Sequence, residues 1–291
     1  MTTAGRLAPL ILALALPPLV TAAAPARWRL VREVPVAEGT VVVASLDERN
    51  AFATGCSSPT HRSVDGGETW SPGYARETCR YGMEAVPGLL VNVGWGGDVR
   101  LSPDVGVHYE RGGTFGGAFP RHPRHLSFLD AKRGLVATDE ELGLTTDGAR
   151  TWQPLLPPDD AAPLAAVSLA EEHGRLALRL LDANGTLWRS DDRGATWTQV
   201  PSPLRSGVLP STKGPTAALR FLGAEGVLAA TLDDAGGLAG RVYRTTDGGK
   251  TWTEEALAAP FHGAALTLSY DGRILSAVGV GGTTVKVYHV Q

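Results

Sequence analysis

The chain has 291 residues, including 36 glycines and 20 prolines, and its 27 basic and 30 acidic side chains give a formal net charge of −3. This near-neutral balance argues against a protein that works by general attraction to phosphate, because nucleic-acid binders usually carry a basic excess. Glycine and proline make up about a fifth of the chain, which is below the level of disordered or collagen-like sequences and typical of many tight turns between short strands.

The first 26 residues have the layout of a secretory signal. Arg6 precedes the apolar run 7–20, and the small-residue stretch TAAAPA follows it. The run is short and rich in proline, so it would make a poor membrane span. We expect cleavage after Ala23 or Ala26, and hence a secreted or periplasmic protein whose mature part has no membrane span. An uncleaved signal anchor is the alternative, and it also places the rest of the chain outside the cytoplasm.

The chain has only two cysteines, Cys56 and Cys79. An even, closely spaced pair in an exported chain predicts a disulfide bond. The alternative is a metal site, but two thiolates with His61 as the only nearby imidazole make an unconvincing zinc site. We therefore expect neither a metal nor a cofactor.

An eight-residue pattern recurs along the rest of the chain. Four copies are SVDGGETW (63–70), TTDGARTW (145–152), SDDRGATW (190–197) and TTDGGKTW (245–252), and a weaker copy is SPDVGVHY (102–109). Successive copies are 39 to 55 residues apart, which is near the period of propeller blades. The repeated aspartates and the aromatic residues that close each copy are Asp65, Asp104, Asp147, Asp192 and Asp247, with Trp70, Tyr109, Trp152, Trp197 and Trp252.

This Ser/Thr-x-Asp-x-Gly-x-Thr-Trp pattern resembles the Asp-box, or BNR repeat, of sialidases, sortilin-type receptors, some glucan hydrolases and the photosystem II assembly factors. The resemblance covers nearly the whole mature chain and implies a β-propeller, while it specifies activity poorly. The aspartate can accept hydrogen bonds from the amides of its own turn, glycine supplies the positive φ, and the Trp covers the turn. We interpret the five aspartates as turn-forming residues, because an acid repeated in every blade is a poor candidate for one active site.

Short β segments before and after each box predict an all-β, six-bladed β-propeller over residues 27–291. Each blade has four antiparallel strands, a to d, with the Asp-box as the c–d turn. The sixth set of segments follows Pro260 and ends before any box. A propeller must close its ring without an open sheet edge, and Trp28 stands where the Trp after a box would be. We predict that the N-terminal strand pairs with 284–290 and closes the ring, giving blades of about 44 residues.

In such a propeller the a–b loops and Asp-box turns share one face, and the b–c loops and d–a connections share the other. Cys56 and Cys79 both fall on the second face, which strengthens the disulfide prediction. That face also carries basic and aromatic residues, including Tyr81 and His122, opposite the acidic loops of Asp139, Asp182 and Asp233. Solvated surface is the ordinary interpretation of such charges, whereas Trp95 in a Gly-rich loop has few neighbours to bury it. The ligand-face candidates are Trp95, Asp98, Arg76, Arg80, Arg121, Arg124, His125, Arg220, Glu140 and Asp233.

Two classes of function fit this layout. The first is an exported, non-catalytic protein-binding or assembly factor. It is similar to the photosystem II assembly factors, which share the export signal, the single propeller and a ligand face with arginines, although that family has seven blades. The resemblance implies a protein or peptide partner, and a glycan is the alternative ligand.

The second class is a glycoside hydrolase of the sialidase type, exo-acting and recognising a carboxylate. Such enzymes need three converging arginines, an acid Asp and a Tyr paired with a Glu. Their Arg-Ile-Pro motif is missing here, and only Arg124 and Arg220 open inner strands as the arginine triad requires. We therefore favour a monomeric binding protein without a catalytic site and without affinity for nucleic acid.

Overall fold

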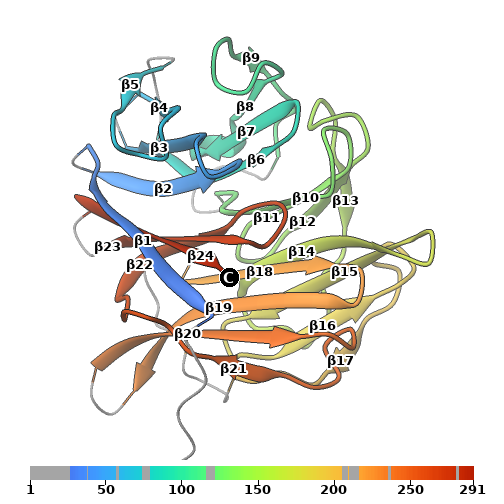
Figure 1. Cartoon of the computed structure of the whole chain (residues 1–291). Helices are drawn as coiled ribbons and strands as arrows, with labels where there is room; N and C mark the ends of the chain where they lie inside the picture. The colour runs from blue at the N-terminus through green and yellow to red at the C-terminus, as the bar shows by residue number, and fades with distance from the viewer. Residues whose placement is uncertain are drawn as a thin grey trace, which may run out of the picture.

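The computed structural model describes residues 27–37, 39–56, 59–73, 79–115, 122–204, 209, 216–234, 237–279 and 282–291. These residues form six four-stranded antiparallel sheets arranged around a central axis, so the predicted six-bladed β-propeller is confirmed (Figure 1). The secretory signal predicted for 1–26, Arg76 and Arg121 lie outside the described residues. The single helical element of the described part is the short 3-10 turn η1 (Trp95–Gly97), and no helix there is long and apolar enough to cross a membrane.

Each blade runs from an inner strand next to the axis to an outer strand at the circumference, and the outer strand is short in blades 1 to 5. Blades 1 to 3 are formed by β2 (Thr40–Ser45), β3 (Ala51–Gly55), β4 (His61–Ser63) and β5 (Ser71–Pro72); β6 (Arg80–Val86), β7 (Leu89–Gly94), β8 (Val99–Ser102) and β9 (Glu110–Arg111); and β10 (His125–Phe128), β11 (Gly134–Ala137), β12 (Leu142–Thr145) and β13 (Gln153–Leu155). Blades 4 and 5 are formed by β14 (Leu164–Glu172), β15 (Arg175–Asp182), β16 (Leu187–Ser190) and β17 (Thr198–Val200); and β18 (Ala217–Leu222), β19 (Glu225–Asp234), β20 (Gly237–Thr245) and β21 (Thr253–Glu255).

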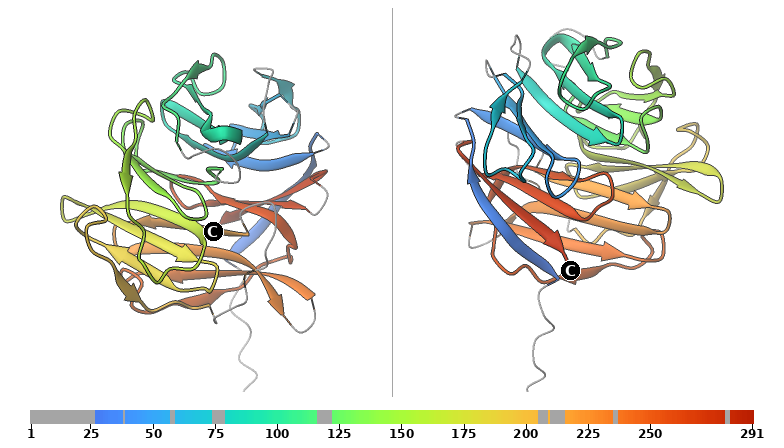
Figure 2. Two further views of the ribbon diagram at one scale, coloured as in Figure 1. Left: turned by 180° about the vertical axis from the view of Figure 1, so that it is seen from behind. Right: turned by 45° about the horizontal axis from the view of Figure 1, so that its top comes forward.

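The two ends of the described chain complete blade 6 together. Its inner three strands are β22 (Gly263–Leu268), β23 (Ile274–Gly279) and β24 (Thr284–Val290), and its outer strand is β1 (Trp28–Pro35). β1 pairs antiparallel with β24, from Trp28 opposite Val290 to Pro35 opposite Thr284. Figure 1 and the right view of Figure 2 show blue β1 beside red β24. The predicted closure of the ring by the N-terminal strand is therefore correct.

The hydrophobic core is divided among the boundaries between neighbouring blades. One cluster joins Leu135 and Leu142 of blade 3 to Val167, Leu178 and Trp188 of blade 4. Because most blades are covered on both sides, strands such as β3 and β12 are buried at every residue. Such strands are short continuous apolar runs rather than alternating ones, and this explains why runs bounded by turns marked them in the sequence.

The Asp-box turns are held by the side chains of the box itself. In the box of Asp247, Thr245 donates its hydroxyl to Oδ1 at 2.8 Å, and Thr251 donates its amide to Oδ1 at 2.9 Å and its hydroxyl to Oδ2 at 2.6 Å. Gly248 and Gly249 supply the positive φ that the turn needs, at 78° and 93°. Equivalent bonds form around Asp65, Asp147 and Asp192.

These hydrogen bonds also act on the acidity of the box aspartates. They favour the ionised carboxylate, and the bonds from Thr196 and Ser190 lower the pKa of Asp192 to about 2. In the weaker box, His108 replaces the Thr and donates its amide to Asp104 Oδ1 at 2.8 Å, while its Nδ1 lies 2.6 Å from Oδ2. Both oxygens of each box carboxylate thus serve the local turn.

Candidate functional site

The backbone hydrogen bonds between loops define the two faces of the propeller. The box amide of Gly148 donates to the Lys132 carbonyl of an a–b loop, whereas the amide of Ala183 in a b–c loop donates to the Pro163 carbonyl of a d–a connection. Cys56 and Cys79 lie in the second group of loops and are joined by the predicted disulfide. We call the face formed by the b–c loops and d–a connections the disulfide face, and the opposite one the box face.

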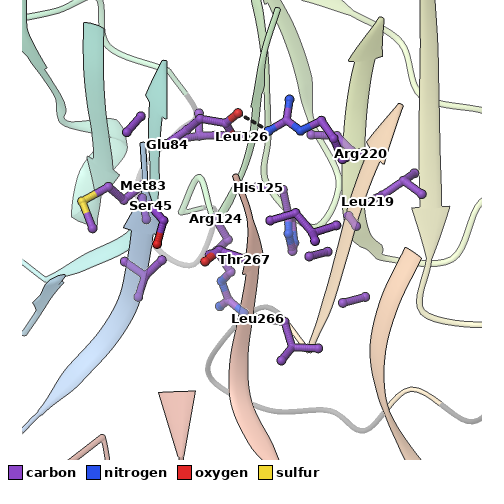
Figure 3. Close-up of a pocket in the computed structure, with 18 residues that line it drawn as sticks. Ser45, Met83, Glu84, Arg124, His125, Leu126, Leu219, Arg220, Leu266 and Thr267 are labelled. Carbon is purple, nitrogen blue, oxygen red and sulfur yellow. Dashed lines mark hydrogen bonds and ion pairs between the residues drawn. The ribbon is translucent and has the colours of Figure 1, made fainter. Parts of the chain in front are cut away.

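The inner strands enclose a small cavity of about 50 Å³ along the axis, lined largely by alanine and other aliphatic side chains (Figure 3). An ion pair crosses it between Arg220 on β18 and Glu84 on β6, which belong to opposite blades. Arg220 also donates to Ser127 Oγ at 3.0 Å and to the Phe128 carbonyl at 3.2 Å. Both partners are buried, and burial raises the pKa of Glu84 although Arg220 opposes the shift. The guanidinium of Arg220, a ligand-face candidate from the sequence, is therefore engaged inside the molecule.

Arg124 and His125 stand side by side at the start of β10 but differ in exposure. His125 is buried, and this burial, with the nearby Arg124 charge, lowers its pKa to about 4, so the imidazole is neutral at pH 7. The Arg124 side chain is 25% exposed, and its Nη1 lies 3.8 Å from Asp139 Oδ1. Arg124 is thus a partly exposed cation on the disulfide face with a loosely held counter-ion.

Three rings pack in a row next to Arg124, and we call them the aromatic shelf: Trp95, His122 and Tyr81. The Trp95 and His122 rings are 4.6 Å apart, and the His122 and Tyr81 rings are 5.2 Å apart and nearly parallel, at 16°. The Arg124 guanidinium lies 6.0 Å from the centre of the Tyr81 ring. Trp95 is 45% exposed although it rests on this support. Burial and the Arg124 charge lower the pKa of His122, which favours an uncharged ring in the stack.

The loop that carries Trp95 is held by charged neighbours. Arg80 pairs with the Asp98 carboxylate at 2.8 Å, and Arg100 approaches the same carboxylate at 3.3 Å. Arg80 is buried, so its charge is used to anchor Asp98. These two candidates from the sequence therefore lie beside the shelf and support it.

The expected acidic half of the disulfide face needs correction. Asp182 is buried, and its carboxylate is used inside its own blade. It accepts hydrogen bonds from the Trp188 indole at 3.2 Å and from the Thr186 amide at 2.9 Å. Asp233 is exposed, but it belongs to β19, which continues through Asp234 instead of ending in a loop before it. Glu140 lies in the loop after β11, where its amide donates to Thr138 Oγ1 at 3.1 Å.

Sequence reasoning missed Glu84, the partner of Arg220. The available signal was Glu84 within the apolar inner segment YGMEAV and a residue of opposite sign, Arg220, in AALRFL. Two opposite charges in strands that are otherwise buried indicate an internal ion pair, because an unpaired buried charge is costly. The described residues hold no group of three His, Cys, Asp or Glu side chains arranged for a metal ion.

Comparison with known proteins agrees with this architecture. The family model for the BNR/Asp-box repeat matches residues 243–254, around Asp247. A search of curated protein sequences gave no significant match. YCF48 from Cyanidioschyzon merolae is similar in structure at a TM-score of 0.53 and 16% identity, over 90% of this chain and 98% of that one. The chain is accordingly a β-propeller built with BNR/Asp-box repeats.

Other solved propellers are similar to the same degree. A structure of YCF48 bound to D1 peptide matches at a TM-score of 0.50 and 16% identity, over 91% of this chain and 95% of that one. The RRP9 WD40 repeats match at 0.59 with 9% identity, over 91% and 98%. The GH74 enzyme of Niastella koreensis matches at 0.54 with 11% identity, over 84% of this chain and 45% of that one. Proteins that share this fold therefore include a peptide binder and an enzyme, so the fold alone does not identify the function.

Proposed function

We propose that this chain is an exported, non-catalytic propeller that binds another protein, or a peptide segment of one, through its disulfide face. The observation that carries the proposal is the aromatic shelf, on which Trp95 is 45% exposed and packs against His122 with the two rings tilted by 30°. Large aromatic side chains on a fixed support dominate many binding surfaces, because they bury much area and lose little conformational freedom on binding.

The charges next to the shelf favour a polypeptide ligand. Arg124 is partly exposed, and its ion pair with Asp139 is long, at 3.8 Å, so it contributes little to stability and leaves the guanidinium available to a second acceptor. A guanidinium beside stacked rings suits a peptide that carries carboxylate or carbonyl groups next to apolar side chains. Arg76 and Arg121 are proposed for the same face from the sequence.

One structural neighbour offers a precedent for a peptide ligand. YCF48, which has this fold, has been solved with a bound D1 peptide. Export is proposed from the charged, apolar and small-residue pattern of residues 1–26.

Glycoside hydrolysis of the sialidase type gains no support from the described residues. The substrate carboxylate would need three available arginines, but Arg220 is buried against Glu84 and Arg80 against Asp98. Hydrolysis of sialosides or glucans by the purified wild-type protein would restore this class of function.

Affinity capture from the native envelope or secretome tests the proposal. The baits are the wild type, Trp95→Ala, Arg124→Ala and the control Leu222→Ala, which removes a residue of similar exposure, 46%, at the box-face end of β18. Loss of a central aromatic contact should lower recovery of the partner about tenfold or more for Trp95→Ala, with a smaller loss for Arg124→Ala and none for Leu222→Ala.

Two results would contradict the proposal. Equal recovery of the same partners by the wild type and Trp95→Ala would show that the aromatic shelf is not the binding site. A captured ligand that survives protease digestion of the extract would indicate a glycan instead of a polypeptide.

A further inference from the structure

The loop that carries Trp95 rests on the backbone next to the disulfide. The Trp95 amide donates to the Cys79 carbonyl at 2.9 Å. A Cβ at Gly94 would lie 2.2 Å from that same carbonyl oxygen, so the two backbone segments approach each other too closely for any side chain at Gly94. Cys79 thus acts as the support of the Trp95 loop.

Arg80, the next residue, holds the other end of the loop. Its guanidinium bonds the Asp98 carboxylate at 2.8 Å and the Asp98 carbonyl at 3.3 Å. The loop closes on itself, because Gly94 donates to the Asp98 carbonyl at 3.0 Å and Asp98 donates to the Trp95 carbonyl at 3.3 Å. The position of Trp95 therefore depends on where Cys79 and Arg80 are held.

The backbone pairing of β6 with β7 holds the start of β6 only weakly. Arg80 and Gly94 form the last pair of the β6–β7 ladder, and an irregularity separates it from the next pair, Gly82 and Val93. Ladder ends open more readily than strand centres. The disulfide from Cys79 to Cys56 adds a covalent tie to blade 1 at this end.

The disulfide is open to solution. Cys56 is exposed and Cys79 is partly exposed, whereas the apolar clusters between the blades contain neither residue. Exposed disulfides are the ones that soluble thiols reduce. Neither the hydrogen bonds of the Asp-box turns nor the apolar clusters of blades 1 and 2 include a cysteine.

We propose that the Cys56–Cys79 disulfide positions Trp95 and makes ligand binding by the disulfide face sensitive to redox conditions. Reduction by a dithiol breaks the S–S bond, and the two sulfurs take up two electrons and two protons to become thiols. The dithiol loses the same two electrons and two protons and becomes a cyclic disulfide. The reduced protein then binds its polypeptide more weakly, because the Trp95 loop must be ordered at the moment of binding. The binding half of this inference rests on the proposed function.

Hydrogen exchange of the ligand-free protein tests the positioning role. With dithiothreitol as the reductant, the Trp95 amide should exchange about tenfold faster or more in the reduced protein, because its acceptor on Cys79 is no longer tied to blade 1. The amides of β15 in blade 4 serve as the internal control and should not change. Unchanged exchange at 94–98 after complete reduction would overturn the inference.

A display library of random peptides, selected on the oxidised wild type, tests the effect on binding. The selected pool should be retained about fivefold to tenfold less by the reduced wild type and by the Cys56→Ser/Cys79→Ser double variant. Dithiothreitol should not affect the double variant, and reoxidation should restore the wild type. Retention that depends on Trp95 but not on reduction would overturn the redox role and leave the proposed function standing. Equal retention by Trp95→Ala and the wild type would contradict the proposed site itself.

Discussion

Aspartate side chains have three different roles in this chain. Asp247 and the other box aspartates hold their own turns, Asp98 neutralises Arg80, and Asp182 is buried under the Trp188 indole. The box role was predictable, because all its partners lie within four residues. The Asp182 role is also local, and its DANGT sequence carried the signal of a turn capped by an acidic side chain. The Arg80–Asp98 pair spans 18 residues and follows from the pairing of β6 with β7.

Replacing His125 by Gln should flatten the dependence of stability on acidic pH. Burial lowers the pKa of His125 to about 4, below its value of about 6.5 in an unfolded chain. The folded state then binds fewer protons than the unfolded state. The contribution of neutral His125 to the free energy of unfolding is therefore complete above pH 6.5 and is lost as the pH falls towards 4. Through His125, the free energy of unfolding of the wild type should fall by about 2 kcal/mol between pH 7 and pH 5.

Urea unfolding at both pH values measures this difference. The free energy of unfolding of His125→Gln should fall less between pH 7 and pH 5 than that of the wild type. The control is His262→Gln, which makes the same replacement at an exposed histidine. Identical pH dependence in wild type and His125→Gln would show that His125 is not the titrating group.

At the scale of the blade, a tryptophan indole fastens each of blades 3 to 6 to the blade before it. The indoles of Trp152, Trp197 and Trp252 donate to backbone carbonyls just after the outer strand of the preceding blade, at 2.9 to 3.0 Å. Trp28 belongs to no Asp-box, but its indole donates to Glu255 at the same place on blade 5, at 2.6 Å. Trp28 therefore takes the place of the Trp that a sixth box would supply, and like the box tryptophans it joins its blade to the preceding one.

Trp28→Ala should destabilise the propeller by about 3–5 kcal/mol, because it removes a fully buried aromatic side chain from the closure of the ring. Trp197→Ala should cost less, since Trp197 is only partly buried. Trp28→Phe should recover part of the loss by keeping an aromatic ring without the bond to Glu255. Chemical denaturation of the three variants measures these differences, and an equal loss for Trp28→Ala and Trp197→Ala would contradict this role.

At the scale of the whole molecule, one ion pair connects opposite sides of the ring. Arg220 of blade 5 reaches Glu84 of blade 2 and also bonds Ser127 of blade 3. Glu84 and Arg220 are 136 residues apart, so the sequence can indicate two opposite charges in buried strands but not the distance between them.

Breaking this pair from one side should cost about 3–5 kcal/mol, because the remaining charge stays buried without its partner. The variants are Glu84→Gln, Arg220→Met and the double substitution, compared by urea unfolding in a double-mutant cycle. The double variant should be clearly more stable than the sum of the single losses implies. Additive losses would show that the two side chains do not interact in solution.

The sequence by itself determined the number of blades, the Asp-box turns, the disulfide and the closure of the ring by the N-terminal strand. These features depend on residues within one turn, on a repeat that can be counted, and on the need to leave no sheet edge open. Tertiary structure alone decided that Trp95, His122 and Tyr81 pack together, that Glu84 lies within reach of Arg220, and that Arg124 stays accessible. Most of these contacts join separate loops or blades. The arrangement of the blades around the axis sets the distances between such segments, independently of their separation along the chain.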